Sequence, residues 1–340
     1  MEKIIFITLD GFREDKIDLS PTLNSIKQNS MYFSGLNTVA PYTFAAHHAI
    51  FSGMYPACNG VNGYSNMFRF KKDEITTLAQ VLQKNGFYTV SETLDETVLP
   101  KQGFDEYNLF DEGTVDLKSR HKELIKKLSK KENNDKYEAC TPLTDDYIAA
   151  IKSALDENGL SDNTLLVIIS DHGTSLGEKY GEKFYGVFAY EYTINVFCML
   201  YHPKLEPKVV TQQCRTIDLY PTILELTGIE NTLTSQIQGE SLMKLVDDDS
   251  SKDRVIFVET GGLYGPWPSP WKHNVFCIKT KNKKLIYNDE PETWEFYDLE
   301  KDPGEENNIY DKDSDTVNDL KNQLLKHFKE NNIDTKISLN

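Results

Sequence analysis

Four residues have side chains that do chemistry and stand at the ends of segments that a fold can bring together: Asp10, Thr43, Asp171 and His172. Asp10 and Asp171 each follow a short apolar run, and a glycine comes one or two residues later. Two carboxylates and an imidazole crowded at one point would repel each other or stay unsatisfied unless a cation joined them. These residues therefore predict a site for a divalent metal ion, with the hydroxyl of Thr43 beside it.

Thr43 has two interpretations that the sequence alone leaves open. It stands directly before "FAAHHAIF", a stretch with helical character, so its side chain can cap that helix. A nucleophilic hydroxyl at the same place gains from the free amides of the helix N-terminus, which stabilise an anionic oxygen or a bound phosphate. A metal on that oxygen would lower the pKa of the hydroxyl much further. Capping and catalysis are compatible, and the competing explanation for either aspartate alone is an ordinary Asp-Gly turn.

The two aspartates follow segments typical of buried parallel strands, residues 3–9 (KIIFITL) and 164–170 (TLLVIIS). Both are short apolar runs rich in β-branched residues, as expected for strands covered on both faces. Ligands of open parallel sheets bind outside the carboxyl ends of the strands, where both aspartates would lie. Helical patterns between and after the strands predict an α/β fold, a doubly wound, mostly parallel sheet with helices on both faces. We expect these helices after Ser20-Pro21, from Thr144 to Gly159 with Tyr147, Ile148, Ile151 and Leu155 on one face, and over 218–226 before Gly228.

The pattern of predicted secondary structure changes at about residue 254. Short strand candidates joined by turns ("RVIFVET", "VFCIKT", "KKLIYN", "WEFYDL") predict a small antiparallel sheet, and a charged helix ends the chain. We therefore expect a catalytic α/β domain over residues 1–250 that carries the metal site. A C-terminal antiparallel-sheet subdomain over residues 251–340 would pack on it. The Lys-rich residues 119–136 suggest a solvated helix and loop.

The composition excludes several classes of partner. The 340 residues carry a net charge of -16, which argues against nucleic-acid binding and against docking on anionic membranes. No apolar run reaches the roughly 18 residues of a membrane span, and the first residues are too quickly followed by Asp10 to form a signal peptide. Five scattered cysteines fit reduced thiols of a cytoplasmic protein. The oligomeric state stays open, a homo-oligomer included.

Long, ordered motifs make the chain resemble the alkaline phosphatase superfamily, in its branch of sulfatases, nucleotide pyrophosphatases/phosphodiesterases and phosphoglycerol transferases. The segments "IIFITLDGFRED" and "YTFAAHHAIFSGMYPACNGVNGYSN" are similar to the opening of the nucleotide phosphodiesterases, where such a threonine is the nucleophile. The segments "DNTLLVIISDHGTSLGEKYGEK", "TIDLYPTILELTGI" and "FYDLEKDPGEENNIY" are more sulfatase-like. The resemblance covers nearly the whole chain.

The resemblance implies a set of site residues. Asp10, Thr43, Asp171 and His172 would be the ligands of one catalytic metal, with Thr43 as the nucleophile. The remaining site residues would contact the substrate or support the nucleophile: Lys183, with Lys179 as the nearby alternative, His47 beside the nucleophile, Asn62 and Asn66 as amide donors, and His273 late in the chain. Each also has a plain structural explanation, a surface charge for the lysines, a core position for His47, turns for the asparagines and a rigid aromatic loop for His273.

Departures from the family pattern limit which nucleophile and how many metal ions we expect. Sulfatases need Cys or Ser in a defined context to make formylglycine, which cannot form from Thr43. The region that binds a second zinc in nucleotide phosphodiesterases has Asp145 and Asp146 here but no histidine, so one metal is favoured over two. An oxygen-rich ligand set with one imidazole suits Zn²⁺ or Mn²⁺ and permits Ca²⁺.

The sequence therefore predicts a metal-dependent hydrolase, or transferase, of phosphate esters that works through a phospho-Thr43 intermediate. The substrate would be a phosphodiester or phosphomonoester of a small molecule or glycan. The first alternative is hydrolysis of a sulfate ester at the same site without formylglycine. The second is a catalytically silent binding protein of the same fold, which the intact set of Asp10, Thr43, Asp171 and His172 argues against.

Overall fold

A mixed six-stranded sheet forms the centre of the computed structural model, which describes residues 1–109, 133–182, 184–233, 235–247, 253–261 and 274–337. The strand order is β1-β5-β6-β2-β7, and β8 also pairs with β2. Only β6 runs antiparallel to its neighbours, so the predicted mostly parallel α/β sheet is confirmed. The strands are β1 (Lys3–Leu9), β2 (Met31–Asn37), β5 (Thr164–Ser170), β6 (Asn195–Tyr201), β7 (Lys208–Val210) and β8 (Cys214–Arg215).

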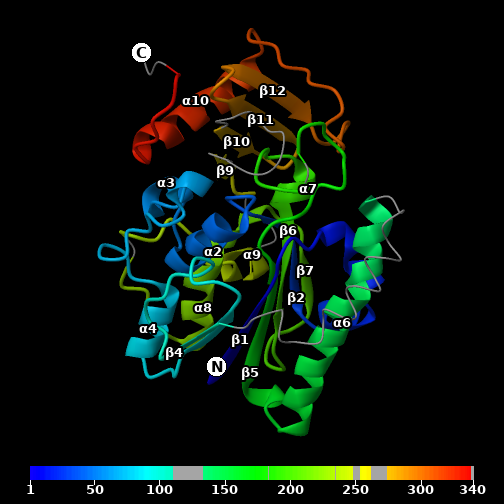
Figure 1. Cartoon of the computed structure of the whole chain (residues 1–340), viewed down its shortest axis with the longest axis vertical. Coiled ribbons are helices and arrows are strands. Elements are labelled where there is room, and N and C mark those ends of the chain that lie inside the picture. The colour runs from blue at the N-terminus through cyan, green and yellow to red at the C-terminus, as the bar shows by residue number, and fades with distance from the viewer. Residues whose placement is uncertain (110–132, 183, 234, 248–252, 262–273, 338–340) are drawn as a thin grey trace.

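Helices cover both faces of this sheet, as the sequence predicts (Figure 1). Side chains of β5 alternate between the two layers, because successive residues of a strand point to opposite faces. Leu165, Val167 and Ile169 pack in one core cluster, and Leu166 and Ile168 pack in the other. The first cluster is completed by α2 (Thr43–Ser52), α4 (Leu78–Lys84), α8 (Leu219–Thr227) and α9 (Met243–Asp247), the second by α1 (Pro21–Gln28) and α6 (Asn133–Glu157).

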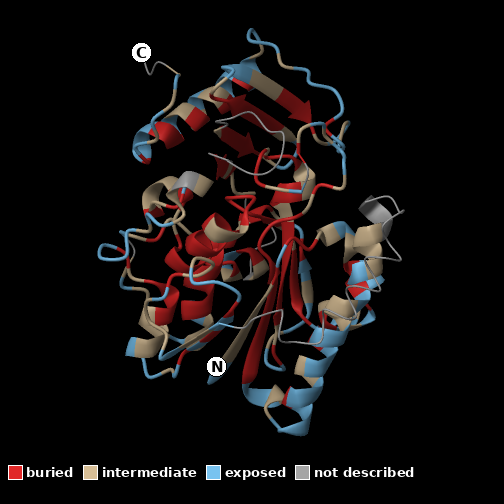
Figure 2. Cartoon of the chain, viewed as in Figure 1, coloured by how far each residue is buried: buried red, intermediate tan, exposed pale blue. Residues whose placement is uncertain are grey.

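Strand β1 differs from the expectation that it is covered on both faces. All seven residues of β5 are buried, whereas Ile4–Thr8 of β1 are only half-buried (Figure 2). The reason is position in the sheet, because β1 is its edge strand and no described strand hydrogen-bonds to its outer side. An apolar β-branched run does not distinguish an edge strand that other elements cover from a central one.

The helix boundaries follow most of the sequence signals. Ser20 caps α1 by accepting a hydrogen bond from the Leu23 N–H at 3.1 Å, and Gly228 ends α8 in the left-handed conformation. Thr43 is the first residue of α2 rather than its cap, which is Tyr42. Helix α6 begins well before Thr144 and runs through Pro142, and Tyr147 is 52% exposed instead of sharing the buried face of Ile148. Most of the Lys-rich stretch 119–136 lies outside the described residues.

The C-terminal segment forms a four-stranded antiparallel sheet in the order β12-β11-β10-β9, with α10 (Asp315–Glu330) packed on it. It lies beyond the carboxyl ends of β1 and β5 (Figure 1). The division into domains at residue 250 stays a prediction. The strands are β9 (Ile256–Thr260), β10 (Val275–Lys279), β11 (Lys283–Asn288) and β12 (Thr293–Asp298).

The described chain also contains a two-stranded parallel sheet of β3 (Val90–Thr93) and β4 (Glu106–Leu109), and two short α-helices, α3 (Pro56–Asn59) and α7 (Glu191–Ile194). The small parallel sheet has no counterpart in the sequence-based expectations. No helix in the part of the chain described is long and apolar enough to cross a membrane.

Candidate active site

Four of the predicted site residues meet at the carboxyl end of the main sheet. Strands β1 and β5 pair in parallel with Leu9 opposite Ser170, so the next residues, Asp10 and Asp171, emerge side by side. Ligand atoms of Asp10, Asp171 and His172 lie within 4.8 Å of one another. The Thr43 hydroxyl, at the start of α2, lies 3.1 Å from His172 Nε2 and 3.3 Å from Asp10 Oδ2.

Two glycines make this convergence sterically feasible. Gly11 turns the chain after Asp10 with a φ of 63°, in the left-handed region that disfavours side chains. Its N–H donates to Asp171 Oδ1 at 3.1 Å, so the turn also ties the two strand ends together. Gly173 packs so closely against the next loop that a Cβ would lie 2.0 Å from the Tyr192 carbonyl oxygen. Both glycines that the sequence motif contains are therefore required by the backbone.

Asp171 is fully buried and only half satisfied. Its Oδ1 accepts hydrogen bonds from the Gly11 and His172 N–H groups, whereas its Oδ2 has no hydrogen-bond partner among the described residues. A buried carboxylate oxygen without a partner is costly and calls for an explanation. The orphan oxygen lies 3.5 Å from His172 Nε2 and 3.7 Å from His47 Nδ1, beyond good hydrogen-bond geometry.

The orientation of His172 points to a cation. Its Nδ1 lies 2.8 Å from the Gly173 carbonyl oxygen, which can only accept, so Nδ1 carries the proton in the neutral ring. The lone pair of Nε2 then faces carboxylate oxygens of Asp171 at 3.5 Å and Asp10 at 3.6 Å. Three electron-rich atoms facing one another at these distances are close to the spacing of ligands bound at about 2.0–2.1 Å around one ion. The donor set therefore fits a divalent metal.

The electrostatics of Asp10 agree with this fit. Although its side chain is exposed at the rim of the site, the surrounding protein displaces much of its water and raises the pKa of the carboxyl group. The neighbouring Asp171 raises the pKa of Asp10 further, while His172 and His47 oppose the shift. A shared cation would relieve the repulsion that Asp10 experiences from the neighbouring carboxylate.

The histidines of α2 are buried, each bonded to its own helix. His47 Nδ1 lies 2.8 Å from the Thr43 carbonyl oxygen and His48 Nδ1 lies 2.7 Å from that of Phe44. Burial lowers the pKa of His48 to about 4, so this ring is neutral. His47 alone of the two lies near the cluster, where it faces Asp171. No side chain caps the N-terminus of α2, which leaves amides of its first turn available to a bound anion.

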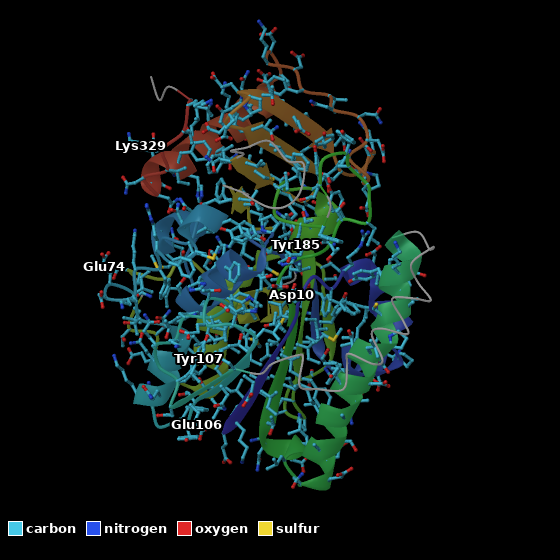
Figure 3. The ribbon with its side chains drawn as sticks, in the orientation of Figure 1. Asp10, Glu74, Glu106, Tyr107, Tyr185 and Lys329 are labelled. Atoms are coloured by element: carbon cyan, nitrogen blue, oxygen red, sulfur yellow. The ribbon has the colours of Figure 1, made fainter. Side chains whose placement is uncertain are left out.

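Tyr185 is a site residue that the sequence reasoning missed. Its ring lies over His172, with the centroids 4.3 Å apart, and its phenol hydrogen-bonds with Thr43. Burial, and secondly the Asp10 carboxylate, raise the pKa of Tyr185, so the phenol keeps its proton at neutral pH. Figure 3 shows Tyr185 and Asp10 close together at the end of the sheet. Nothing in the local pattern "FYGVFAYEY" distinguishes this tyrosine from its neighbours.

The remaining predicted residues lie elsewhere or outside the described part. Lys179 contacts the Glu305 carbonyl oxygen and lies 5.0 Å from the centre of the Tyr190 ring, against the C-terminal segment. Asn66 donates to Asn62 at 2.7 Å in an exposed turn. Lys183 and His273 fall outside the described residues. Asp145 accepts hydrogen bonds from Thr22 at 2.7 and 3.0 Å, which gives this carboxylate a structural role at the start of α1.

Three family sequence profiles match successive parts of the chain. Residues 4–110 match type I phosphodiesterase / nucleotide pyrophosphatase, residues 118–229 match sulfatase, and residues 181–333 match the C-terminal part of N-sulphoglucosamine sulphohydrolase. These matches confirm the resemblance to the sulfatases and nucleotide phosphodiesterases of the alkaline phosphatase superfamily. The chain combines a phosphodiesterase-like opening with a sulfatase-like remainder, the same division that its motifs indicate.

The curated proteins similar to this chain include several sulfatases. The chain is 32% identical over 212 residues to an N-acetylglucosamine-6-O-sulfatase of Bacteroides thetaiotaomicron, a match that covers 59% of this chain and 37% of the relative. It is 25% identical over 215 residues to an arylsulfatase of Clostridium perfringens, covering 61% of this chain and 42% of the relative. The chain thus spans well under half the length of the curated relatives it matches.

Solved structures share the fold along almost the whole chain. One, in complex with its substrate D-glucosamine-2-N,6-O-disulfate, has a TM-score of 0.81 at 16% identity and covers 97% of this chain and 98% of that one. The phosphonate monoester hydrolase SpPMH from Silicibacter pomeroyi has a TM-score of 0.76 at 16% identity, covering 97% and 96%. At this identity the likeness establishes the fold alone.

Proposed function

We propose that this protein hydrolyses a phosphate ester with Thr43 as the nucleophile. The observation that carries the proposal is the position of the Thr43 hydroxyl, 3.1 Å from His172 Nε2 and 3.3 Å from Asp10 Oδ2 at the start of α2. A hydroxyl held against a carboxylate and an imidazole at a helix N-terminus is the arrangement that an activated alcohol nucleophile needs. Tyr185, which hydrogen-bonds with Thr43, adds a second hydroxyl group beside it.

Asp10, Asp171 and His172, with the oxygen of Thr43, would hold one divalent cation, with Zn²⁺ or Mn²⁺ favoured and Ca²⁺ as the alternative. The cation would supply Lewis-acid chemistry, neutralising the two carboxylates and withdrawing charge from oxygen atoms at the cluster. The orphan oxygen of Asp171 supports this assignment, because it needs a partner that the described residues do not provide.

The chain's own groups account for the two halves of the reaction. Thr43 Oγ attacks phosphorus in line with the leaving oxygen, and the hydroxyl proton passes toward Asp10, to which it already donates. The departing oxygen takes a proton from solvent and leaves as an alcohol, while Asp10 releases its proton to solvent. Water then attacks the same phosphorus and gives one proton to the Thr43 oxygen, and inorganic phosphate, or a phosphomonoester from a diester substrate, is released. Amides at the start of α2 bind the non-bridging oxygens, where negative charge gathers in both transition states.

His47 would position the nucleophile rather than react. Its Nδ1–H donates to the Thr43 carbonyl oxygen at 2.8 Å, which fixes the first turn of α2 and with it the Thr43 side chain. Lys183 stays our candidate for the positively charged side chain that contacts the substrate. His273, Asn62 and Asn66 stay candidates for further substrate contacts. Lys179 has a weaker claim, because its ammonium group is already engaged by Glu305.

Hydrolysis of a sulfate ester is the second candidate, and the sulfatase names of the curated relatives favour it. The identity of the nucleophile favours phosphate. A formylglycine hydrate has a second hydroxyl that expels sulfate by elimination, whereas a sulfated threonine has no such exit and must be attacked again at sulfur. Phospho-Thr43 can instead be opened by in-line attack on phosphorus. The substrate would be a small-molecule or glycan ester.

Paired nitrophenyl esters test this proposal directly. We expect kcat/KM for 4-nitrophenyl phosphate, or for a 4-nitrophenyl phosphodiester, to exceed that for 4-nitrophenyl sulfate by at least about 100-fold, roughly 2.7 kcal/mol. Thr43→Ala should lower kcat by at least about 1,000-fold with an unchanged circular dichroism spectrum, and Thr43→Ser should retain part of the activity. A preference for sulfate, or full activity in Thr43→Ala, would refute the proposal.

A further inference from the structure

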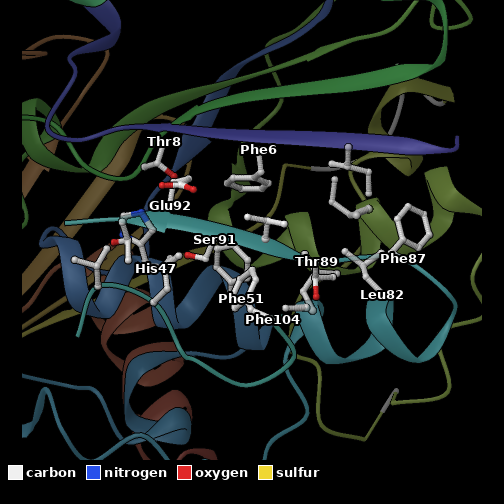
Figure 4. A pocket seen from close by; sticks show the side chains of 18 of the residues that line it. Phe6, Thr8, His47, Phe51, Leu82, Phe87, Thr89, Ser91, Glu92 and Phe104 are labelled. Carbon is white, nitrogen blue, oxygen red and sulfur yellow. The ribbon is translucent and has the colours of Figure 1, made fainter. Parts of the chain in front are cut away.

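A cavity of ≈350 Å³ opens directly from the candidate active site. Asp10, Thr43 and His47 line one end of it. From there it follows strand β1, lined in turn by Thr8, Phe6 and Ile4, the alternate side chains that point to one face of that strand. The opposite walls come from α2, α4 and the segment that contains β3 (Figure 4).

The cavity changes character along its length. Its end at the catalytic cluster is polar, where Figure 4 shows Thr8, His47 and Glu92 close together. Away from that end the lining is mostly hydrocarbon, although Thr89 also lies there (Figure 4). The apolar side chains there are Ile4, Phe6, Phe51, Leu82, Phe87 and Phe104. From Thr8 to Ile4 the strand rises roughly 13 Å, which sets the depth of the apolar part.

The described lining residues offer little to a glycan or to a second anionic group. Their only charged side chains are the carboxylates of Asp10 and Glu92, and no Lys or Arg is among them. Thr89 is already engaged, because its hydroxyl donates to the Gly103 carbonyl oxygen at 2.5 Å. The Ser91 hydroxyl is the one buried side-chain group of this wall without a hydrogen-bond partner among the described residues. A sugar would therefore leave most of its hydroxyls unpaired.

We propose that this cavity binds the organic group of the substrate, and that this group is an unbranched hydrocarbon chain. The inference rests on the proposed function, because the ester head must sit at Asp10 and Thr43 for its tail to enter between β1 and α4. The match is one of polarity as well as place. The anionic head would lie at the end that carries the proposed metal site and the amides of α2, and the methylenes would lie along the aromatic and leucine walls. The substrate class is then an alkyl ester rather than a glycan ester.

Binding of n-alkylphosphonates to the metal-loaded protein tests this without any turnover. A buried methylene improves affinity by up to about fourfold. We therefore expect n-octylphosphonate to bind at least 100-fold more tightly than ethylphosphonate in isothermal titration calorimetry. The phosphonate bearing a 2-(2-ethoxyethoxy)ethyl chain has the same length with two ether oxygens and should bind within about tenfold of ethylphosphonate. Equal affinities for the octyl and ethyl compounds, or for the octyl and ether compounds, would overturn the proposal.

A matched pair of variants tests where the hydrocarbon chain of the ligand binds. Leu82 lies in the apolar part of the cavity and outside the catalytic cluster. Leu82→Gln should lower the affinity for n-octylphosphonate by at least tenfold and leave that for ethylphosphonate unchanged. Leu82→Met, which keeps the site apolar and of similar volume, should leave both unchanged. If both variants bind the octyl compound like the wild type, the octyl group does not occupy this cavity and the inference is wrong.

The proposed reaction and this inference fail in different ways. Absence of turnover with nitrophenyl phosphate, together with preserved discrimination between octyl and ethyl phosphonates, would refute the reaction and leave the cavity assignment standing. Turnover of nitrophenyl phosphate without discrimination between octyl and ethyl phosphonates would refute the cavity assignment and leave the proposed reaction standing.

Discussion

Two regions of this molecule bury carboxylates, and they treat them differently. At the junction between the main sheet and the C-terminal sheet, the fully buried Lys284 lies 2.7 Å from both Glu191 and Glu305. Lys279 adds a second ammonium group 2.8 Å from Glu191 and donates to Asn37 at 2.7 Å. Here two cations of the chain itself meet two carboxylates.

The cluster of Asp10, Asp171 and His172 has no such balance. Asp10 and Asp171 face each other with His172, and the described residues bring no lysine or arginine into contact with them. Burial alone would raise the pKa of Glu191, but Lys279 and Lys284 outweigh it and lower that pKa to about 2. For Asp10 the same burial is reinforced by another carboxylate. An uncompensated pair of this kind marks a place where the compensating charge comes from outside the chain.

Glu182 shows a third way to bury a carboxyl group. It is 5% exposed, accepts hydrogen bonds from Val187 N–H and Phe188 N–H at 3.1 Å and from the Tyr192 hydroxyl at 2.7 Å. Burial raises its pKa to about 7, so it keeps its proton in mildly acidic solution. Comparison of the three regions predicts which substitutions remove the bound metal, which lower the free energy of unfolding and which change the pH dependence of stability.

Asp171→Asn should break the cluster most severely. The amide keeps an oxygen for the Gly11 and His172 N–H groups and replaces only the orphan oxygen. We expect loss of bound metal by elemental analysis and at least about a 1,000-fold drop in kcat, about 4 kcal/mol. Glu92→Gln, an exposed carboxylate in the adjoining cavity, is the control and should keep its metal. Full metal content in Asp171→Asn would mean that the cluster is only structural.

Lys284→Met tests the region in which the chain supplies its own cations to the buried carboxylates. Removing this cation leaves Glu191 and Glu305 buried without it, at a cost of about 3–5 kcal/mol of unfolding free energy. Urea denaturation measures the loss. The exposed Lys281→Met should change stability by less than about 0.5 kcal/mol. Metal content should be unchanged in both variants, and a loss of metal in Lys284→Met would show that the two regions are coupled.

The sequence predicts the parts of this site that depend on strand ends. Asp10, Asp171 and His172 are recoverable because an apolar run followed by Asp and Gly is a local signal, and parallel pairing brings the two ends together. The Tyr185 contact, the β3–β4 pair and the cavity along β1 depend on how distant segments pack, for which the sequence has no periodic signature. The sequence predicts a helix that begins at Thr144, whereas α6 begins at Asn133 and continues through Pro142, a residue that normally breaks a helix.

Glu182 should give a measurable pH dependence of stability. Its pKa is about 7 in the folded protein and 4.5 as an unperturbed group, so the folded state binds the extra proton. Its favourable contribution is complete below about pH 4.5 and is lost as the pH rises through 7, a change of about 3 kcal/mol. Urea unfolding of wild type and Glu182→Gln at pH 5 and pH 8 measures it. The decline between these pH values should be smaller in the variant by roughly that amount, and an identical decline would contradict the assignment.

Tyr185→Phe is the mildest test of the cluster, because it removes one hydroxyl and keeps the ring over His172. The phenol hydrogen-bonds with Thr43, and burial raises its pKa, so it keeps a proton that it can donate once the Thr43 oxygen gains negative charge. A donor beside the Thr43 oxygen stabilises negative charge that develops there before attack on phosphorus. One such hydrogen bond is worth about 1.4 kcal/mol, so kcat should fall about tenfold while KM and metal content stay constant. The acid limb of the pH profile of kcat/KM should also move to higher pH, since the Thr43 oxygen would lose its proton less readily. Tyr180→Phe, a fully exposed tyrosine of the same loop, is the matched control and should leave all three quantities unchanged. A Tyr185→Phe rate within twofold of the wild type would leave the phenol a packing role alone.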